Sequence, residues 1–154
     1  MTAYSFAVES GVENLTELFP MYAQHYREMK ERLEAEGLSV AEFNPRVDEY
    51  VKAWLGGYLL NFVVRCDGKA VGYSNIYLTN DMHNSELIAR EDTIFVLPEH
   101  RNGTGKQFSK FILGELRSRG VKRLHVTALT DLRVAKLWKR MGFQPVASAM
   151  VYSF

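Results

Sequence analysis

A short segment in the second half of the chain places the strongest constraint on the fold. Residues 92–108 contain a strand pattern, a proline stop at Pro98, a turn with Gly103 and Gly105, and the start of an amphipathic helix. A helix N-terminus has unpaired N–H groups and a partial positive charge, and glycines let a phosphate approach the backbone. Arg101 and Lys106 add positive charge beside this turn. The segment therefore predicts an anion site, and a pyrophosphate fits it better than a single carboxylate.

This turn does not match the phosphate loop of nucleotide hydrolases. That loop requires a glycine where His100 stands and a serine or threonine where Gln107 stands. The predicted anion site is therefore not tied to nucleotide hydrolysis.

The first half of the chain predicts two helices and a hairpin. A strand at residues 4–8 precedes apolar residues at intervals of three and four over 15–33, which indicate a helix packed on a core. Pro20 should kink or restart this helix. Asn44 and Pro45 predict the start of a second helix over 47–54. The turn Asp67-Gly68 then predicts a β-hairpin between two apolar runs.

The second half adds a strand at 87–96, a helix from the Gly103 turn to Gly120, a strand at 121–129, a helix from Asp131 to Gly142, and a strand at 143–154. The order is strand, two helices, three strands, helix, strand, helix, strand. It predicts an α/β fold with a mixed sheet, antiparallel in its first half and joined by crossover helices in its second. We expect one domain over residues 1–154.

Composition narrows the class of protein. The 19 basic and 18 acidic residues leave a net charge of +1, so no global field attracts nucleic acid or an anionic membrane. Cys66 is the one cysteine, and the histidines have no metal-ligand spacing, so we expect neither a disulfide nor a metal. We find no leader and no apolar run of about 20 residues, and we expect a cytoplasmic protein.

Two motifs resemble the GNAT superfamily of acetyltransferases. The first is a strand that ends in Val96-x-Pro98 and continues through Arg101 into the glycine-bearing turn, which is one residue shorter than the family pattern. The second spans residues 131–143 and has the spacing of the family's Asn-x-x-Ala-x-x-Leu-Tyr-x-x-x-Gly-Phe. Here Asp131 stands at the Asn position and Trp138 at the Tyr position.

The resemblance covers the whole chain and is strongest over residues 90–143. The hairpin strands are also similar to the family's second and third strands. The polar loop that contains His83, with the acidic strand and the irregular turn after it, is similar to GNAT proteins of tailed bacteriophages.

The resemblance implies a GNAT fold and transfer of an acetyl group from acetyl-CoA to a primary amine, either a small molecule or a protein amino group. The amine would attack the thioester directly in a ternary complex. The position of the family's catalytic glutamate is Asp92, with Glu91 adjacent, and strand alternation predicts that only one of them faces the cleft. The N–H of Phe95 or Val96 is the expected oxyanion donor.

The resemblance also implies the residues that hold the cofactor. Trp138 replaces the tyrosine that commonly protonates the thiolate, so solvent is expected to supply that proton. The expected cofactor-binding residues are Phe95, Val96, Arg101, Asn102, Gly103, Thr104, Gly105, Lys106, Asp131, Lys136 and Trp138.

Several of these residues also have an ordinary structural interpretation. Asp92 and Glu91 also fit a solvated strand start, and Asp131 fits a helix cap. Trp138 continues an apolar helical stripe, and Lys136 fits a solvated helix face as well as a contact to the 3′-phosphate of coenzyme A.

The rival to an enzyme is a non-catalytic GNAT-fold module that binds an acyl-CoA or a protein without transfer. An enzyme needs an open acceptor groove with Asp92 or Glu91 at its floor, whereas Phe43, Tyr50 or Trp54 would fill the groove of a binding module. Residues 34–48, where acceptor specificity is expected, suggest only a mild preference for a cationic amine. A homodimer is compatible with the resemblance.

Overall fold

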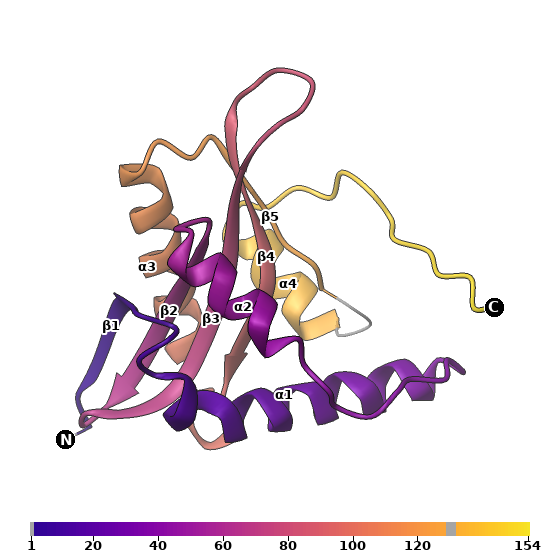
Figure 1. The fold of residues 1–154 in the computed structure, drawn as a ribbon, viewed down its shortest axis with the longest axis horizontal. Coiled ribbons are helices and arrows are strands. Elements are labelled where there is room, and N and C mark those ends of the chain that lie inside the picture. The colour runs from indigo at the N-terminus through magenta and orange to yellow at the C-terminus, as the bar shows by residue number, and fades with distance from the viewer. Residues whose placement is uncertain (1, 129–131) are drawn as a thin grey trace.

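The chain forms a three-layer α/β structure with a central sheet (Figure 1). It was obtained as a computed structural model, which describes residues 2–128 and 132–154. Within these residues, five strands form one sheet in the order β1-β2-β3-β4-β5. The strands are β1 (Tyr4–Glu9), β2 (Leu59–Cys66), β3 (Lys69–Asn80), β4 (Leu87–Val96) and β5 (Arg123–His125). β1 to β4 are antiparallel neighbours and β5 is parallel to β4, so the predicted mixed sheet is confirmed.

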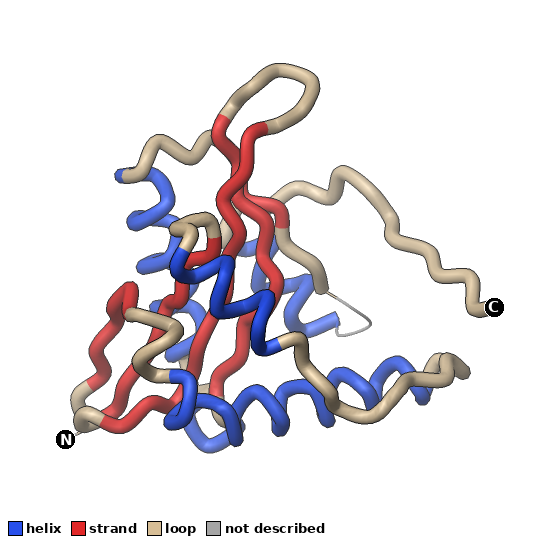
Figure 2. Tube along the Cα trace, viewed as in Figure 1, coloured by secondary structure: helices blue, strands red, loops and turns tan. Residues whose placement is uncertain are grey.

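Helices cover both faces of the sheet (Figures 1 and 2). They are α1 (Leu15–Ala35), α2 (Val47–Leu55), α3 (Thr104–Ser118) and α4 (Leu132–Arg140), and a short 3-10 turn, η1, spans Pro98–His100. α1 and α2 lie on one face, and α3 lies on the other.

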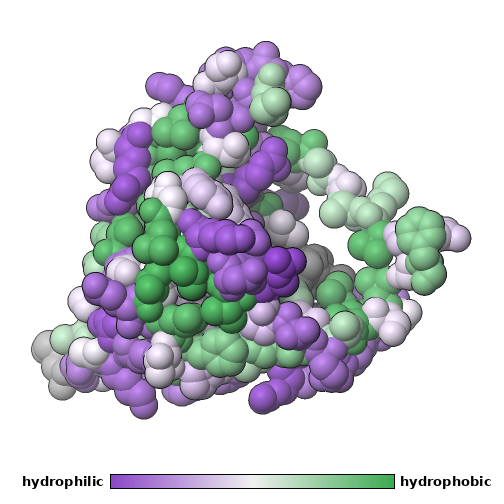
Figure 3. All heavy atoms as spheres, in the orientation of Figure 1, coloured by the Kyte–Doolittle hydropathy of each residue, from purple (hydrophilic) through white to green (hydrophobic). Residues whose placement is uncertain are grey.

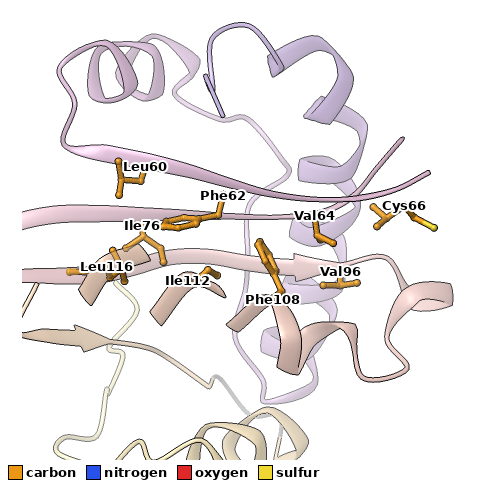
Figure 4. Close-up of a cluster of buried hydrophobic side chains, with 11 residues drawn as sticks. Leu60, Phe62, Val64, Cys66, Ile76, Val96, Phe108, Ile112 and Leu116 are labelled. Atoms are coloured by element: carbon orange, nitrogen blue, oxygen red, sulfur yellow. The ribbon is translucent and has the colours of Figure 1, made fainter. Parts of the chain in front are cut away.

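The main core lies between the sheet and α3 (Figure 4). Phe108, Ile112 and Leu116 recur at intervals of four along α3, so they share one face of the helix and are buried against the strands. A smaller core forms on the other face, where Leu18 and Met21 of α1 pack on the sheet. The sheet is therefore held from both sides.

The hairpin between β2 and β3 forms as predicted. Asp67 and Gly68 have φ angles of 49° and 83°, and a two-residue turn with positive φ at both positions matches the twist of the flanking strands. The register pairs Cys66 with Lys69 across this turn.

Two helix predictions need correction. α1 runs through Pro20 without a restart, because a proline in the second turn removes only one backbone hydrogen bond while the apolar face continues, and a kink at Pro20 stays a prediction. α2 begins at Val47 rather than at Pro45, because Arg46 has a non-helical ψ of 73°. Pro45 instead belongs to the connection between the helices.

The last strands are shorter than predicted. β5 covers only residues 123–125 of the expected 121–129, of which residue 129 lies outside the described residues. The expected strand at 143–154 is wrong, because these residues form no strand. A three-residue edge strand offers few pairing partners, and Pro145 lacks an N–H group. The segment extends from the body with its apolar side chains exposed, Met150 being 91% exposed (Figures 1 and 3).

Two further features concern only residues 2–128 and 132–154. None of the helices there has the length and apolarity that a bilayer crossing requires. No three His, Cys, Asp or Glu side chains there come together as a metal site would require.

Candidate active site

A cavity of about 520 Å³ lies between α1, the connection from α1 to α2, and β4. Small-molecule sites commonly enclose about 300–1,000 Å³, so its size suits a small ligand. Its walls are mostly apolar and aromatic, and its lining extends to Thr127 and Ala128, just past β5. Phe43, Tyr50 and Trp54 form walls of this cavity and leave it open.

A β-bulge in β4 sets the direction of the Asp92 side chain. Asn75 of β3 pairs with Thr93 and Ile76 pairs with Glu91, so Asp92 is the extra residue without a partner. A bulge re-aims side chains because alternation is interrupted at the extra residue. The Asp92 carboxylate accepts a hydrogen bond of 2.7 Å from the Tyr50 hydroxyl on α2. Asp92 therefore faces the same side of the sheet as α1 and α2.

The environment of Asp92 suits a base. Asp92 contacts solvent through the open cavity, but the surrounding protein partly desolvates its carboxylate and raises its pKa above the ordinary value. The hydrogen bond from Tyr50 opposes this rise. Burial, followed by the nearby Asp92 charge, raises the pKa of Tyr50 itself, so its hydroxyl stays protonated as a donor.

Glu91 lies where β4 and β5 separate. It also lines a small pocket with Ser109 and Ile112 of α3, and its carboxylate accepts a hydrogen bond of 3.3 Å from the Thr127 N–H. Burial raises the pKa of Glu91 to about 7, an effect that the Thr127 bond opposes and the Asp92 charge reinforces.

Glu91 pairs with Ile76, which lies in the core against α3, whereas Asp92 is held by Tyr50 of α2, so the two side chains lie on opposite sides of the sheet, as strand alternation predicted. Both residues nevertheless border the cavity. The pairing of β5 with β4 ends at Arg90, so beyond this point the cavity continues around the edge of β4.

Arg101 is engaged with α1 rather than with the glycine turn. Its guanidinium donates to the Val96 carbonyl at 2.7 Å and to Glu28 at 2.9 Å, and it lies 5.2 Å from the centre of the Phe95 ring. The Phe95 ring also stacks on His25, with ring centres 4.9 Å apart. Arg101 thus joins α1 to the end of β4.

The turn before α3 presents free space at the helix N-terminus. Gly103 precedes the helix with a φ of 85°, and no side chain in the described part of the chain caps the first N–H groups. A Cβ atom at Gly105 would meet nothing within 4 Å. Thr104 is buried, whereas Asn102 and Lys106 are exposed beside the turn. This part of the expected anion site is therefore accessible.

The edge of β4 distinguishes the two expected oxyanion donors. The N–H of Leu97 donates to the Val71 carbonyl on β3 at 2.8 Å. Successive N–H groups of a strand point to opposite edges, so the N–H of Val96 points away from β3 and that of Phe95 points toward it. Val96 therefore directs its N–H toward the side where β5 has diverged.

α4 places Trp138 against the β4 side of the site. Trp138 is 6% exposed, packs on Phe143 with ring centres 4.9 Å apart, and lines the small pocket together with Glu91. Its buried indole N–H has no partner among the described residues. Lys136 is exposed on the same helix. Asp131, the expected start of this motif, lies outside the described residues.

A buried polar network behind the cavity was not predicted from the sequence. Asn75 accepts hydrogen bonds from the Trp54 indole at 3.2 Å and from Asn61 at 3.0 Å. The sequence did contain one indication of this network, namely single asparagines inside apolar strand patterns. Such asparagines are buried, and a buried amide requires hydrogen-bond partners. The network fixes the Trp54 ring in the cavity wall.

Gly11 is required by the position of Trp54. A Cβ atom at Gly11 would lie 2.3 Å from the Trp54 ring. We expect Gly11→Ala to displace this ring, to lower the free energy of unfolding by about 1–3 kcal/mol and to shift tryptophan fluorescence. Urea unfolding with Gly114→Ala as control measures this, since a Cβ at Gly114 meets nothing within 4 Å. Unchanged stability and an unchanged spectrum in Gly11→Ala would contradict the close contact.

The fold is that of several solved acetyltransferases. A ribosomal-protein-alanine N-acetyltransferase from Brucella melitensis covers 99% of this chain and 98% of its own, at 18% identity and a TM-score of 0.77. An aminoglycoside acetyltransferase from an uncultured soil metagenomic sample, in complex with trehalose, covers 98% of this chain and 93% of its own. Its sequence identity is 18% and its TM-score is 0.65. An acetyltransferase from Clostridium acetobutylicum, with acetyl-CoA, covers 99% of this chain and 96% of its own. Its sequence identity is 13% and its TM-score is 0.69. At these identities the likeness shows the fold alone.

The family follows from the sequence match. The model of the acetyltransferase (GNAT) family matches residues 16–143, and the chain belongs to this family. A search of curated protein sequences gives no match. The GNAT resemblance of the two motifs is thereby confirmed, while the likeness to bacteriophage members stays a prediction.

Proposed function

We propose that this protein is an acetyl-CoA-dependent N-acetyltransferase that acts on a primary amine, with residues 1–154 as one domain. The observation that carries the proposal is the open cavity lined by both Asp92 and Glu91. Phe43, Tyr50 and Trp54 line this cavity without filling it, which favours the enzyme over the binding module. The solved relatives include a ribosomal-protein-alanine N-acetyltransferase and an aminoglycoside acetyltransferase, and acceptors of both kinds carry amino groups.

The residues present fit coenzyme A. The uncapped N-terminus of α3, the open space at Gly105 and the exposed Lys106 suit a pyrophosphate. The buried, unpartnered indole N–H of Trp138 is a further donor on the β4 side. We assign binding to residues 102–106 and to Phe95, Val96, Arg101, Lys136 and Trp138, and we keep Asp131 as a prediction. Arg101 would act mainly by holding the end of β4.

The proposed chemistry assigns one task to each group. Bound acetyl-CoA would supply the acetyl group as an activated thioester, and the thiolate released when the C–S bond breaks would take its proton from solvent, because Trp138 stands where the family commonly has a tyrosine. Asp92 binds the ammonium group of the acceptor and takes its proton, and Tyr50 orients the Asp92 carboxylate. The N–H of Val96 is the donor that we assign to the acetyl carbonyl, because it points to the open edge. Glu91, with a pKa of about 7, is the acceptor that we assign to the second proton that the amine nitrogen loses.

Titration calorimetry with acetyl-CoA tests the cofactor site. We expect micromolar binding by the unmodified protein and a loss of at least about tenfold in Gly105→Glu, because the new carboxylate repels the pyrophosphate. Gly114→Glu is the matched control on the same helix, since both positions have open space for a Cβ. Equal binding by both variants would contradict this site.

Release of the coenzyme A thiol in the presence of amines then separates the two functions. Transfer to an amine supports the enzyme, and binding without transfer supports the non-catalytic module. A cytoplasmic location and a homodimer stay predictions.

A further inference from the structure

The apolar face of α1 forms one wall of the cavity. Phe19, Tyr22, Tyr26 and Met29 follow one another at intervals of three and four and all line the cavity. The face of α1 that the sequence predicted to pack on a core therefore borders the cavity. An apolar ligand in the cavity would cover these side chains as core residues otherwise would.

The connection between α1 and α2 extends the α1 wall. The Phe43 ring lies 5.7 Å from the Phe19 ring and 5.4 Å from the Tyr26 ring. The Tyr26 hydroxyl donates to the Ala41 carbonyl at 2.7 Å and holds the connection against α1. This aromatic wall is therefore fixed before a ligand binds.

The polar ends of Tyr50 and Trp54 already have hydrogen-bond partners. The Tyr50 hydroxyl donates to Asp92 and the Trp54 indole donates to Asn75. The Tyr50 and Trp54 ring centres lie 5.7 Å apart. These two residues thus offer ring faces next to a carboxylate, an arrangement that attracts one cation.

Charge differs between the walls of the cavity. Within the described lining, the carboxyl groups are those of Glu91 and Asp92, and both residues lie on β4. The α1 side chains Phe19, Tyr22, Tyr26 and Met29 carry no charge. A ligand with one ammonium group matches the Asp92 side, whereas a second ammonium group at the other end of the ligand would meet apolar and aromatic side chains.

We propose that the acceptor is a monoamine with an apolar, ring-sized or alkyl body, held with its amino group at Asp92 and its body against the aromatic wall that α1 and Phe43 form together. This inference rests on the proposed function. Polyamines and aminoglycosides are poor acceptors, because an ammonium group placed against the apolar wall of α1 and Phe43 loses water without gaining a carboxylate there.

A matched pair of amines tests the preference. Hexylamine and hexamethylenediamine have the same length and differ in one amino group. We expect kcat/KM for acetyl transfer to be at least about tenfold higher for hexylamine, with phenethylamine also favoured over kanamycin. Phe43→Ala is expected to lower kcat/KM for phenethylamine about tenfold without changing the affinity for acetyl-CoA. The control is Phe154→Ala, the same substitution at a residue that is fully exposed outside the cavity.

A binding measurement keeps the acceptor proposal separate from catalysis. Trp54 lines the cavity, so titration of each amine is followed by tryptophan fluorescence without acetyl-CoA. Tighter binding of hexylamine and phenethylamine supports the acceptor proposal. Equal or better binding or transfer of hexamethylenediamine overturns it and leaves the acetyltransferase proposal standing. Acetyl-CoA binding without transfer to any amine overturns the acetyltransferase proposal, and the fluorescence titration still decides the preference of the cavity.

Discussion

Replacing Asp92 with asparagine is expected to lower kcat/KM for acetyl transfer by about 10²- to 10³-fold, the range typical of a lost general base. Asparagine keeps the size of the side chain and still accepts the Tyr50 hydrogen bond, but it neither takes a proton nor attracts an ammonium group. The affinity for acetyl-CoA should not change, because Asp92 lies in the cavity and not at the N-terminus of α3. Steady-state kinetics and calorimetry together measure both effects.

The control for this variant removes a carboxylate elsewhere. Asp67→Asn changes the exposed turn between β2 and β3, where asparagine tolerates the positive φ of 49°. It should keep full activity. An Asp92→Asn variant with more than about a tenth of the normal kcat/KM would exclude Asp92 as the base and leave Glu91 as the other carboxyl among the described residues that line the cavity.

Replacing Glu91 with glutamine is expected to stabilise the protein at pH 8. The pKa of Glu91 is about 7 in the folded protein against an ordinary value of 4.5, so the folded state binds the proton more tightly than the unfolded state. Stability must therefore fall as the pH rises from about 4.5 to 7, since deprotonation favours the unfolded chain. At about 1.4 kcal/mol per pKa unit, the loss at pH 8 has an upper limit of about 3 kcal/mol. Glutamine remains uncharged and still accepts from the Thr127 N–H.

Urea unfolding at two pH values measures this effect. The variant should exceed the unmodified protein in free energy of unfolding at pH 8, and the difference should vanish near pH 4, where Glu91 is protonated in both states. Glu99→Gln, at an exposed position in η1, should show no such difference at either pH. A difference that is the same at both pH values would show that the Glu91 carboxyl is not destabilised by burial.

Local chemistry explains why much of the fold was predictable. The Asp67-Gly68 turn needs positive φ at both positions, and few residue pairs supply it without strain. The α3 pattern places Phe108, Ile112 and Leu116 on one face whatever the surroundings are. The prediction of a strand at 143–154 was wrong because it relied on the apolar residues of this segment. A strand also needs a neighbouring strand to pair with, and β5 is too short to provide one.

The candidate site was predictable only as a set of residues. The sequence selected Asp92 and Glu91, but alternation alone would have pointed Glu91 rather than Asp92 to the side of Thr93, where α2 lies. The bulge at Asp92 reverses this, and it arises from the pairing of β4 with β3. Arg101 was expected at the glycine turn, whereas the Glu28 carboxylate on α1 holds it at 2.9 Å. Tyr50 became part of the site through its bond to Asp92.

The sequence by itself determined the helices, the first four strands, the hairpin turn and the family, because each depends on residues that are neighbours along the chain or at fixed helical spacing. Only the tertiary structure decided which surfaces face the ligand. The apolar stripe that includes Phe19, Tyr22 and Tyr26 looks the same in sequence whether it covers a core or an open cavity. The position of α2 and Phe43 makes this stripe a wall of the cavity. Contacts between segments that are distant in the sequence leave no local pattern from which they could be predicted.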